Sequence, residues 1–354
     1  MIQVIRLLLF PFSLLYGLGV MIRNTAYRWG WLPSKSFQLP VIVVGNLAVG
    51  GAGKSPMTEY LIKLFKKGYH LAVLSRGYGR KTRGFRFVQQ NDMVAVSGDE
   101  PLQFKQHFPD QTIAVCEDRV AGVERLQADH DLIILDDAFQ HRALKPSFQI
   151  LLFDFASLKR FNWLLPTGNL REPIWARNRA DIIVVTKAPK SLSAAEKLKI
   201  RQKMKPKAHQ ALFFSYLRYA DLKSIQDAET RSLESLTSQT QILLLSGIAN
   251  PKPIVEELNR HAVQLVHHAY PDHHLYTRKN ILKLAAAFKE MSGADKLILT
   301  TEKDAQRLNT PEIAALLAEL PIYILPVEAA FDEPDKEDFE HLLKQHAREH
   351  TNHH

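Results

Sequence analysis

The sequence predicts an α/β protein with three parts: a mostly parallel sheet with helices on both faces, a second, smaller α/β/α domain, and an N-terminal membrane-interface helix. From Pro40 onward, short apolar runs alternate with amphipathic ones, which is the pattern of a parallel sheet covered by helices. A chain of 354 residues is long enough for two domains that each bury a core. The residues before this pattern form an apolar segment of their own.

The composition favours an anionic partner. The formal net charge is +9, which suits phosphates, anionic lipid or nucleic acid, and charge alone does not choose among them. The single cysteine, Cys116, excludes an intramolecular disulfide framework and a thiolate metal cluster.

The N-terminal segment has the features of an interfacial anchor. Residues 7–22 form an uncharged run between Arg6 and Arg23, and Trp29 and Trp31 follow. The run is shorter than the roughly 18–20 residues that span a bilayer comfortably. The alternatives are a buried core helix and a cleaved signal peptide; the second is disfavoured because a phosphate-binding motif that needs cytosolic ATP follows closely. We expect a retained helix that lies in the membrane surface.

The apolar runs after this segment are predicted to be strands. They are 41–44, 71–75, 112–116, 131–137, 148–154, 181–187 and 211–217, then 241–247, 262–268, 295–301 and 321–327. Helices are expected at 56–67, 100–107, 118–127 and 192–204.

Four segments follow from this series. We expect 1–30 to be the membrane-associated helix and 31–215 the core domain with the phosphate-binding loop. Residues 216–240 are expected to be a connector, and 241–354 a C-terminal α/β domain.

The strand–loop–helix pattern over residues 41–61 predicts a P-loop NTPase-type core. The loop and helix start that would bind the nucleotide are Gly50, Gly51, Ala52, Gly53, Lys54 and Ser55. Glycines let backbone N–H groups converge on an anion, and the helix N-terminus adds its positive end. Lys54 is expected to reach the β and γ phosphates, and the Ser55 hydroxyl to bind Mg²⁺. The motif departs from the strict pattern at Ala48, where glycine is usual, and a glycine-rich turn without a ligand is the alternative.

Two adjacent carboxylates, Asp136 and Asp137, follow the apolar run 132–135. The carboxyl ends of parallel strands hold the ligand in such sheets, and P-loop enzymes have a Mg²⁺-binding aspartate there. Successive strand residues point to opposite faces, so one of the two would bind the metal more directly. A hydrated turn at the strand end is the alternative.

The segment 97–104 contains Asp99 and Glu100 directly before a proline. An acid at this place is either a general base or a helix N-cap, and the spacing does not decide between them. The basic, glycine-rich segment 75–87, with Arg76 and Tyr78, could clamp an anionic substrate, face lipid headgroups, or be an exposed loop.

Three further segments contain polar clusters. Arg171 and Glu172 could bind phosphate and sugar hydroxyls or form a surface ion pair. Asp272, His273 and His274 suggest a general acid–base dyad or, less well, a metal site. The triplet Glu302, Lys303 and Asp304 follows a predicted strand and is typical either of a loop that contacts a nucleotide or of a capped helix start.

Eight segments resemble, in the same chain order, the blocks of the tetraacyldisaccharide 4′-kinases, the lipid A kinases of Gram-negative bacteria. These segments are GNLAVGGAGKSP, SRGYGR, GDEP, DDAFQH, LLPTGNLREP, SGIANP, YPDHH and TEKD. The resemblance covers roughly residues 1–310. Departures are small: Ser55 stands where threonine is more usual, and Ala138 and Ala249 stand where glycine is common. Members usually have threonine at the position of Ala48.

The resemblance implies ATP- and Mg²⁺-dependent phosphorylation of the 4′-hydroxyl of an acylated glucosamine disaccharide 1-phosphate. It implies two α/β/α domains with the active site between them. The N-terminal helix would rest on the cytoplasmic face of the bacterial inner membrane. We expect a monomer and no nucleic-acid partner.

The resemblance also assigns roles to residues. The catalytic residues would be Asp99 as the base, His273 as its partner, and Lys54; Ser55, Asp136 and Asp137 would bind the metal. Glu302, Lys303 and Asp304 would join the loop residues 50–55 in binding nucleotide. Substrate would be bound by Arg76, Tyr78, Glu100, Arg171 and Glu172.

Two other functions fit the sequence less well. A membrane-associated P-loop nucleotide switch would need neither GDEP nor YPDHH, and such switches often have a lysine where this chain has Val49. A soluble nucleotide or cofactor kinase would have no use for the apolar N-terminus.

Overall fold

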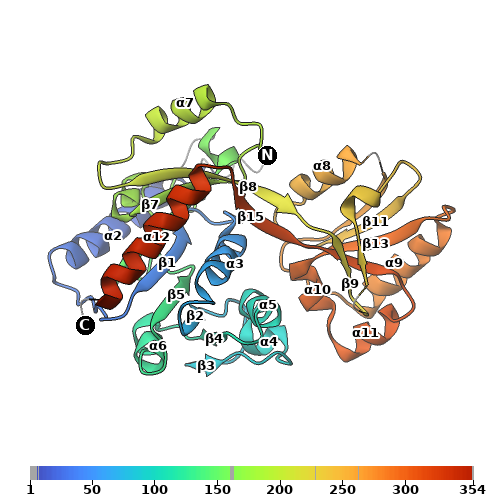
Figure 1. Ribbon diagram of the computed structural model, residues 1–354, viewed down its shortest axis with the longest axis horizontal. Coiled ribbons are helices and arrows are strands. Elements are labelled where there is room, and N and C mark those ends of the chain that lie inside the picture. The colour runs from blue at the N-terminus through green and yellow to red at the C-terminus, as the bar shows by residue number, and fades with distance from the viewer. Residues whose placement is uncertain (1–5, 7, 160–162, 228, 262, 353–354) are drawn as a thin grey trace.

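The structure is a computed structural model that describes residues 6, 8–159, 163–227, 229–261 and 263–352 (Figure 1). Two sheets, each covered by helices, lie side by side in the view of Figure 1. The predicted α/β class with two sheet-based units is confirmed.

In the described part of the chain, nine strands form the first sheet. Their order is β15 (Val327–Phe331), β8 (Ala211–Tyr219), β7 (Ile182–Thr186), β6 (Phe148–Asp154), β1 (Val41–Asn46), β5 (Leu132–Asp136), β2 (Leu71–Ser75), β4 (Thr112–Val115) and β3 (Arg86–Phe87). The two edge strands, β3 and β15, pair antiparallel, and the inner pairs are parallel. The parallel inner strands are buried on both faces, which is why they read as continuous apolar runs.

Both faces of the first sheet are covered. Helices α3 (Lys54–Phe65), α5 (Asp99–His107) and α12 (Asp335–Asn352) pack on one face, next to the short α4 (Val94–Ser97). Helices α6 (Arg119–Leu126) and α7 (Ala194–Met204) pack on the other face, with the 3-10 turns η1 (Phe155–Lys159) and η2 (Ile174–Arg179). Alternate residues of β1 enter opposite cores, Ile42 with the first group and Val43 with the second, as the two-residue period of a strand requires.

A smaller sheet forms the second domain. Among the described residues its six strands run in the order β10 (Thr230–Arg231), β9 (Leu222–Ser224), β14 (Ile322–Leu325), β13 (Lys296–Thr301), β11 (Gln241–Ser246) and β12 (Gln264–Ala269). Helix α8 (Lys252–Arg260) and the turn η3 (Leu233–Ser235) cover one face; α9 (Arg278–Glu290), α10 (Glu302–Leu308) and α11 (Pro311–Leu317) cover the other.

The domain boundaries differ from those expected. The segment 216–240 is not only a connector, because β9 and β10 lie in it and pair in the second sheet. The C-terminal end of the expected 241–354 domain returns to the first sheet: β15 pairs with β8, and Phe339 of α12 packs in the core against Phe331. The apolar run 321–327 hid this crossing, because one continuous run contains β14, Pro326 and the first residue of β15.

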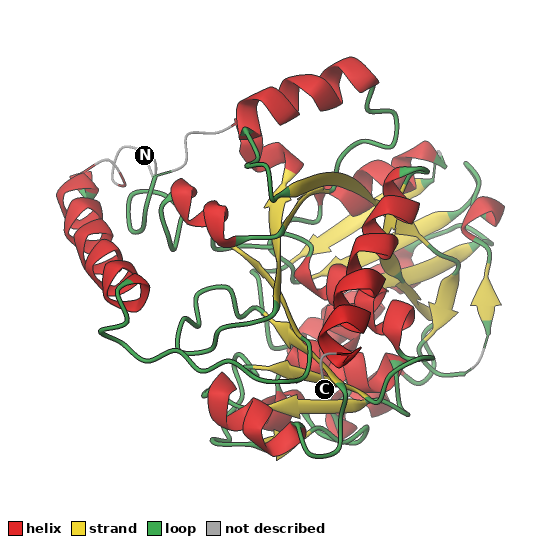
Figure 2. Cartoon of the chain, turned by 60° about the vertical axis from the view of Figure 1, so that its left-hand side comes forward, coloured by secondary structure: helices red, strands yellow, loops and turns green. Residues whose placement is uncertain are grey.

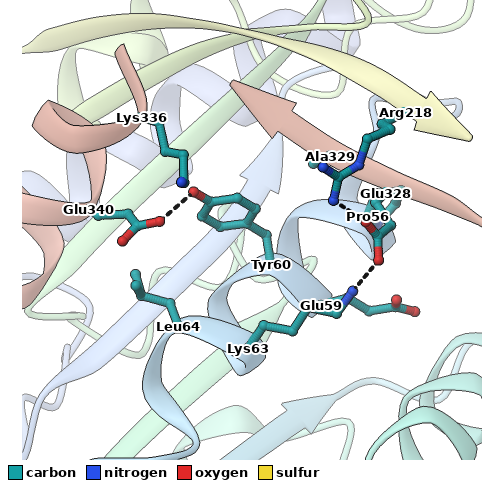
Figure 3. Close-up of a pocket in the computed structure, with 10 residues that line it drawn as sticks. All are labelled: Pro56, Glu59, Tyr60, Lys63, Leu64, Arg218, Glu328, Ala329, Lys336 and Glu340. Carbon is teal, nitrogen blue, oxygen red and sulfur yellow. Dashed lines mark hydrogen bonds and ion pairs between the residues drawn. The ribbon is translucent and has the colours of Figure 1, made fainter. Parts of the chain in front are cut away.

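Two chain crossings therefore join the domains, from β8 to β9 and from β14 to β15. The crossings contact each other through the amide of Ala220, which donates to the carbonyl of Pro326 at 3.1 Å. A pocket lies beside them, between α3, β8, β15 and α12 (Figure 3). In it Lys63 of α3 and Arg218 of β8 both pair with Glu328 of β15, and Tyr60 donates to Glu340 at 2.8 Å. These contacts tie the helix after the glycine-rich loop to the strands that link the domains.

The N-terminal helix α2 (Phe10–Arg28) has an inverted pattern of burial, and Figure 2 shows it at one side of the molecule. The residues that it buries against the domain are Ser13, Gly17 and Asn24. Its large apolar residues face outward: Phe12, Leu14, Leu15, Leu18, Met21 and Ile22 are all exposed. No helix among the described residues is long and apolar enough to cross a membrane.

Candidate active site

The glycine-rich loop between β1 and α3 has the backbone that its glycines permit. Gly50 and Gly53 adopt φ values of +116° and +80°, which side chains with a Cβ rarely allow. The Thr186 hydroxyl at the end of β7 donates to the Ala52 carbonyl at 2.8 Å and braces the loop. Among the described residues no side chain caps the start of α3. The first-turn amides of α3 are therefore available to an anion.

Lys54 lies at the start of α3 and faces the end of β5. Its ammonium is 3.7 Å from the Asp137 carboxylate, and the Arg171 guanidinium is 3.3 Å from the same group. Asp137 has a φ of +47°, an uncommon value that turns the chain out of the strand. The loop lysine, this aspartate and Arg171 therefore meet at the carboxyl edge of the sheet, where a phosphate would lie between two cations.

Ser55 and Glu100 form a direct link between the loop and α5. The Ser55 hydroxyl donates to Glu100 Oε1 at 2.7 Å, and Lys303 from the second domain donates to the same oxygen at 2.6 Å. Burial alone would raise the pKa of Glu100, but Lys303 and Lys54 lower it below its ordinary value. The structure places Glu100 beside the expected metal ligand Ser55, whereas the sequence analysis expected it to contact the acceptor substrate.

Asp136 is the last residue of β5 and is buried. It accepts from the Thr58 hydroxyl at 3.2 Å and from the Ser75 hydroxyl at 3.4 Å. Burial, together with the neighbouring charges of Glu100 and Asp137, raises the pKa of Asp136 to about 7. A cation near this carboxyl would offset both causes.

The donors around Ser55 fit Mg²⁺. In the described part of the chain no group of three or more His, Cys, Asp or Glu side chains is arranged to hold a metal on its own. Mg²⁺ in phosphoryl-transfer enzymes needs only one or two carboxylates, because water and substrate phosphates supply its other oxygens. Ser55 with Glu100, and Asp136 nearby, provide such a partial set.

Asp99 lies where the two domains meet. Its Oδ2 accepts from Arg307 Nη2 at 2.6 Å and is 3.2 Å from Nδ1 of His273, and both partners belong to the second domain. Burial would raise the pKa of Asp99, but His273, Lys303 and Arg307 hold it far below its ordinary value. The hydrogen bond to Asp99 in turn raises the pKa of His273, against the effect of burial. The expected pair of Asp99 and His273 is therefore assembled, although 174 residues separate them by number.

Arg307 is not among the site residues predicted from the sequence. It lies on α10 three residues after Asp304, one helical turn away on the same face, and its side chain is almost fully buried. The three-residue spacing from Asp304 was the one sequence signal that Arg307 has a structural role. A buried arginine is expected to have a charged partner. The partner is Asp99, which no local pattern indicates.

Of the triplet that follows β13, Lys303 contacts Glu100, the carboxylate that binds the Ser55 hydroxyl. Asp304 is fully buried and accepts from the Gly247 amide, the Thr301 hydroxyl and Arg307, so it holds the second domain together. Glu302 is also buried and lies 3.3 Å from His107. Both side chains are buried at the first turn of α10, and their contact with a nucleotide stays a prediction.

Glu172 is also away from the site. It is fully buried beneath α2, where it accepts from Asn24 at 2.9 Å and from Arg179 at 2.6 Å. The substrate contact expected for Glu172 is therefore not available, and this glutamate anchors the N-terminal helix instead. Arg171 beside it faces Asp137, since adjacent residues of an extended chain point to opposite sides.

The segment after β2 exposes the residues expected to bind substrate. Arg76 is exposed and Tyr78 is 70% exposed. The Tyr78 ring centre lies 5.7 Å from that of His273, which adopts a φ of +59°. Tyr78 therefore lies beside the Asp99–His273 pair and is free to contact a bound molecule.

The sheet and site together define a P-loop phosphotransferase. A braced glycine loop with Lys54 and Ser55, carboxylates at the strand ends, and a carboxylate–histidine pair resemble the parts that phosphoryl-transfer enzymes use. The chain belongs to the tetraacyldisaccharide-1-P 4′-kinase family, whose model matches residues 5–348.

The relatives agree with this family. A tetraacyldisaccharide 4′-kinase of Parabacteroides distasonis is 42% identical over 96% of this chain and 94% of its own length. One of Flavobacterium johnsoniae is 42% identical over 93% of this chain and 94% of its own. The solved structure of LpxK from Aquifex aeolicus in complex with ATP superposes with a TM-score of 0.74 at 28% identity, covering 97% of this chain and 99% of that one.

Proposed function

We propose that this protein transfers the γ-phosphoryl group of ATP to the 4′-hydroxyl of a tetraacylated glucosamine disaccharide 1-phosphate, a lipid A precursor. The observation that carries the proposal is the Asp99–His273 contact across the domain boundary, beside the phosphate-binding loop. The names of the relatives, which match nearly full length, support the acceptor. The ATP complex of the Aquifex aeolicus relative supports the donor.

The nucleotide would bind at the start of α3. Gly50, Gly51, Ala52 and Gly53 form the loop that surrounds the phosphates, and Lys54 and Arg171 offset their charge. The ion pairs that these two cations make with Asp137 support this role, since Asp137 keeps both side chains at the edge of the sheet before phosphate arrives.

Mg²⁺ would be held by Ser55 and Asp136, with Asp137 near it, and we add Glu100 to this set. The Ser55–Glu100 hydrogen bond and the raised pKa of Asp136 support a cation at this place. When bound, Mg²⁺ offsets the negative charge of the phosphates that the reaction moves. The chain's own donors orient it against the loop.

Asp99 would accept the proton of the acceptor hydroxyl, with His273 hydrogen-bonded to it. A sugar hydroxyl is a poor nucleophile, and a positioned base contributes roughly 10²–10⁴-fold to such a step. The cationic neighbours of Asp99 keep it ionised, so it is a weak base whose contribution comes from its position beside the acceptor hydroxyl. His273, whose pKa is raised, can share the proton that Asp99 accepts. Tyr78 is the exposed side chain beside the pair that would contact the acceptor, and Arg76, exposed on the same segment, would join it.

The acylated acceptor resides in a membrane, and α2 would bring the enzyme there. Its polar residues face the protein and its apolar residues face outward, which is the opposite of a soluble surface helix. We infer a peripheral position on the cytoplasmic face of the inner membrane. One chain supplies both halves of the Asp99–His273 pair, which supports a monomer.

The test is phosphoryl transfer in detergent micelles. Purified full-length protein is mixed with γ-labelled ATP, Mg²⁺ and the tetraacyl disaccharide 1-phosphate, with Lys54→Ala as the control. We expect label in the lipid only when Lys54 is intact. ATP hydrolysis without labelled lipid would overturn the proposal and favour a nucleotide switch.

A further inference from the structure

We propose that Arg307 is a positioning residue of the reaction: it fixes the Asp99 carboxylate and the His273 ring in one arrangement when the two domains meet. The inference rests on the proposed role of Asp99 as the base. None of the roles above includes Arg307, which the sequence analysis also passed over.

Arg307 is held rigidly within the second domain before it reaches Asp99. Its Nη1 donates to the carbonyl of Gly247 at 2.8 Å and to Asp304 Oδ1 at 3.0 Å. Asp304 is held in turn by the Thr301 hydroxyl at 2.7 Å. The Arg307 side chain is 2% exposed, so these contacts are shielded from water. One nitrogen is thus fixed by the second domain, and the other is left to face the first domain.

The carbonyl of Gly247 sets the position of both Asp99 partners. It accepts from Arg307 Nη1 and also from the backbone amide of His273 at 3.1 Å. A Cβ on Gly247 would lie 3.1 Å from Asp304 Oδ1, so the peptide is closely packed at this point. The Arg307 guanidinium and the backbone of His273 are therefore anchored at the same carbonyl.

At Asp99 the two groups share one acceptor. Arg307 Nη2 and His273 Nδ1 lie 2.6 Å and 3.2 Å from Asp99 Oδ2, and 3.1 Å from each other. A guanidinium only donates, so the acceptor common to both is the carboxylate oxygen. With the Nδ1 proton of His273 directed at Asp99 Oδ2, the ring donates to the same oxygen as Arg307. Asp99 Oδ1 accepts from the backbone amide of the next residue, Glu100, at 3.0 Å.

This arrangement requires a guanidinium. Two nitrogens of one planar group span the distance from Gly247 and Asp304 in one domain to Asp99 in the other. A lysine ammonium would supply the charge from a single nitrogen and could not span both. The same helix offers a matched control, because Gln306 contacts Gln106 across the domain boundary at 2.6 Å without touching Asp99.

The experiment compares kcat and KM of the full-length protein with Arg307→Ala, Arg307→Lys and Gln306→Ala, in the micelle assay with ATP and acceptor lipid. We expect Arg307→Ala to lower kcat by roughly 10²-fold, as for a catalytic group displaced by about an ångström, with KM for ATP little changed. Arg307→Lys should retain the fold and still lose most of kcat. Gln306→Ala should be close to the unchanged protein. Guanidinium ion added at millimolar concentration should restore part of kcat to Arg307→Ala and to no other variant.

A double-mutant cycle separates positioning from a general structural role. In an Asp99→Ala background, Arg307→Ala should reduce the residual kcat no further, because the group that it positions is absent. Additive losses, or full kcat in Arg307→Lys, would overturn the inference. If instead Asp99→Ala keeps its kcat, the proposed base is wrong, and this outcome is distinct from the failure of Arg307 alone.

Discussion

The Lys303 ammonium of the second domain donates to the Glu100 carboxylate of the first domain at 2.6 Å, across 203 positions of the chain. The same Glu100 oxygen accepts the hydroxyl of Ser55 at the start of α3. The second domain therefore contacts the phosphate-binding helix through one intervening carboxylate.

Glu100→Gln should weaken the use of Mg²⁺. The amide keeps the size of the side chain but loses the negative charge that faces Ser55, so we expect the Mg²⁺ concentration for half-maximal activity to rise roughly 10-fold or more. The measurement is initial rate against Mg²⁺ at saturating ATP. Glu124→Gln, which removes a surface ion pair with Lys35, is the control. An unchanged Mg²⁺ requirement would remove Glu100 from the metal site.

Lys54→Ala should strongly lower the rate of transfer while leaving the fold intact. The lysine is the loop cation nearest the expected phosphates, and loss of one such electrostatic contact costs about 10²–10³-fold in kcat. Lys67→Ala, an exposed lysine just beyond α3, is the control and should keep full activity. Thermal unfolding of both variants checks that they remain folded. A kcat near that of the unchanged protein would contradict the assignment.

The free energy of unfolding should fall as pH rises through neutrality, because of two titratable groups at the domain boundary, Glu302 and His107. Burial raises the pKa of Glu302 to about 7, and hydrogen bonding and charge from Glu59 raise the pKa of His107 despite its burial. Both groups bind a proton more tightly in the folded protein than in the unfolded chain, so the stabilisation is present at low pH. It is lost as pH rises through the folded pKa values.

Glu302→Gln should remove much of this pH dependence. For Glu302 the shift from 4.5 to about 7 corresponds to a change on the order of 3 kcal/mol between pH 4.5 and 8. The measurement is the free energy of unfolding by urea over this range. Glu312→Gln on α11 is an exposed control. A parallel pH dependence in Glu302→Gln and the unchanged protein would show that Glu302 is not responsible.

The triple substitution Leu14→Ser, Leu18→Ser and Ile22→Ser should release the protein from lipid vesicles. These side chains follow one another at four-residue spacing on α2 and are 60%, 52% and 61% exposed. Each apolar side chain inserted into the bilayer surface contributes about 1.5 kcal/mol or more, so the triple variant should bind at least about 100-fold more weakly in flotation. Leu198→Ser on α7, also exposed, is the control. Unchanged flotation of the triple variant would overturn the role of α2.

Phe339→Ala should destabilise the first domain. This side chain of α12 is fully buried and stacks on Phe331 of β15 at 4.5 Å, so its loss should cost about 3–5 kcal/mol. Leu342→Ala on the exposed side of the same helix should cost far less. Urea unfolding followed separately in each domain would reveal which one is weakened. A loss confined to the second domain would contradict the observed packing.

The sequence by itself determined the elements whose signal is local. Lys54 and Ser55 follow a glycine loop within a few residues of a buried strand, and Asp136 and Asp137 end another; a short stretch of chain sets these relations. The apolar segment that becomes α2 was evident for the same reason. Most strands of both sheets were predicted, because burial on both faces leaves a continuous apolar run.

Only the tertiary structure decided which distant surfaces meet. Arg307 faces Asp99, and Glu172 supports α2 instead of a substrate, although neither is distinguished by its neighbours in sequence. The return of α12 to the first sheet was equally hidden, since an amphipathic helix shows that it has an apolar face but not which core that face will join. Contacts of this kind depend on how whole domains pack against each other. The pattern of residues along one segment does not indicate that packing.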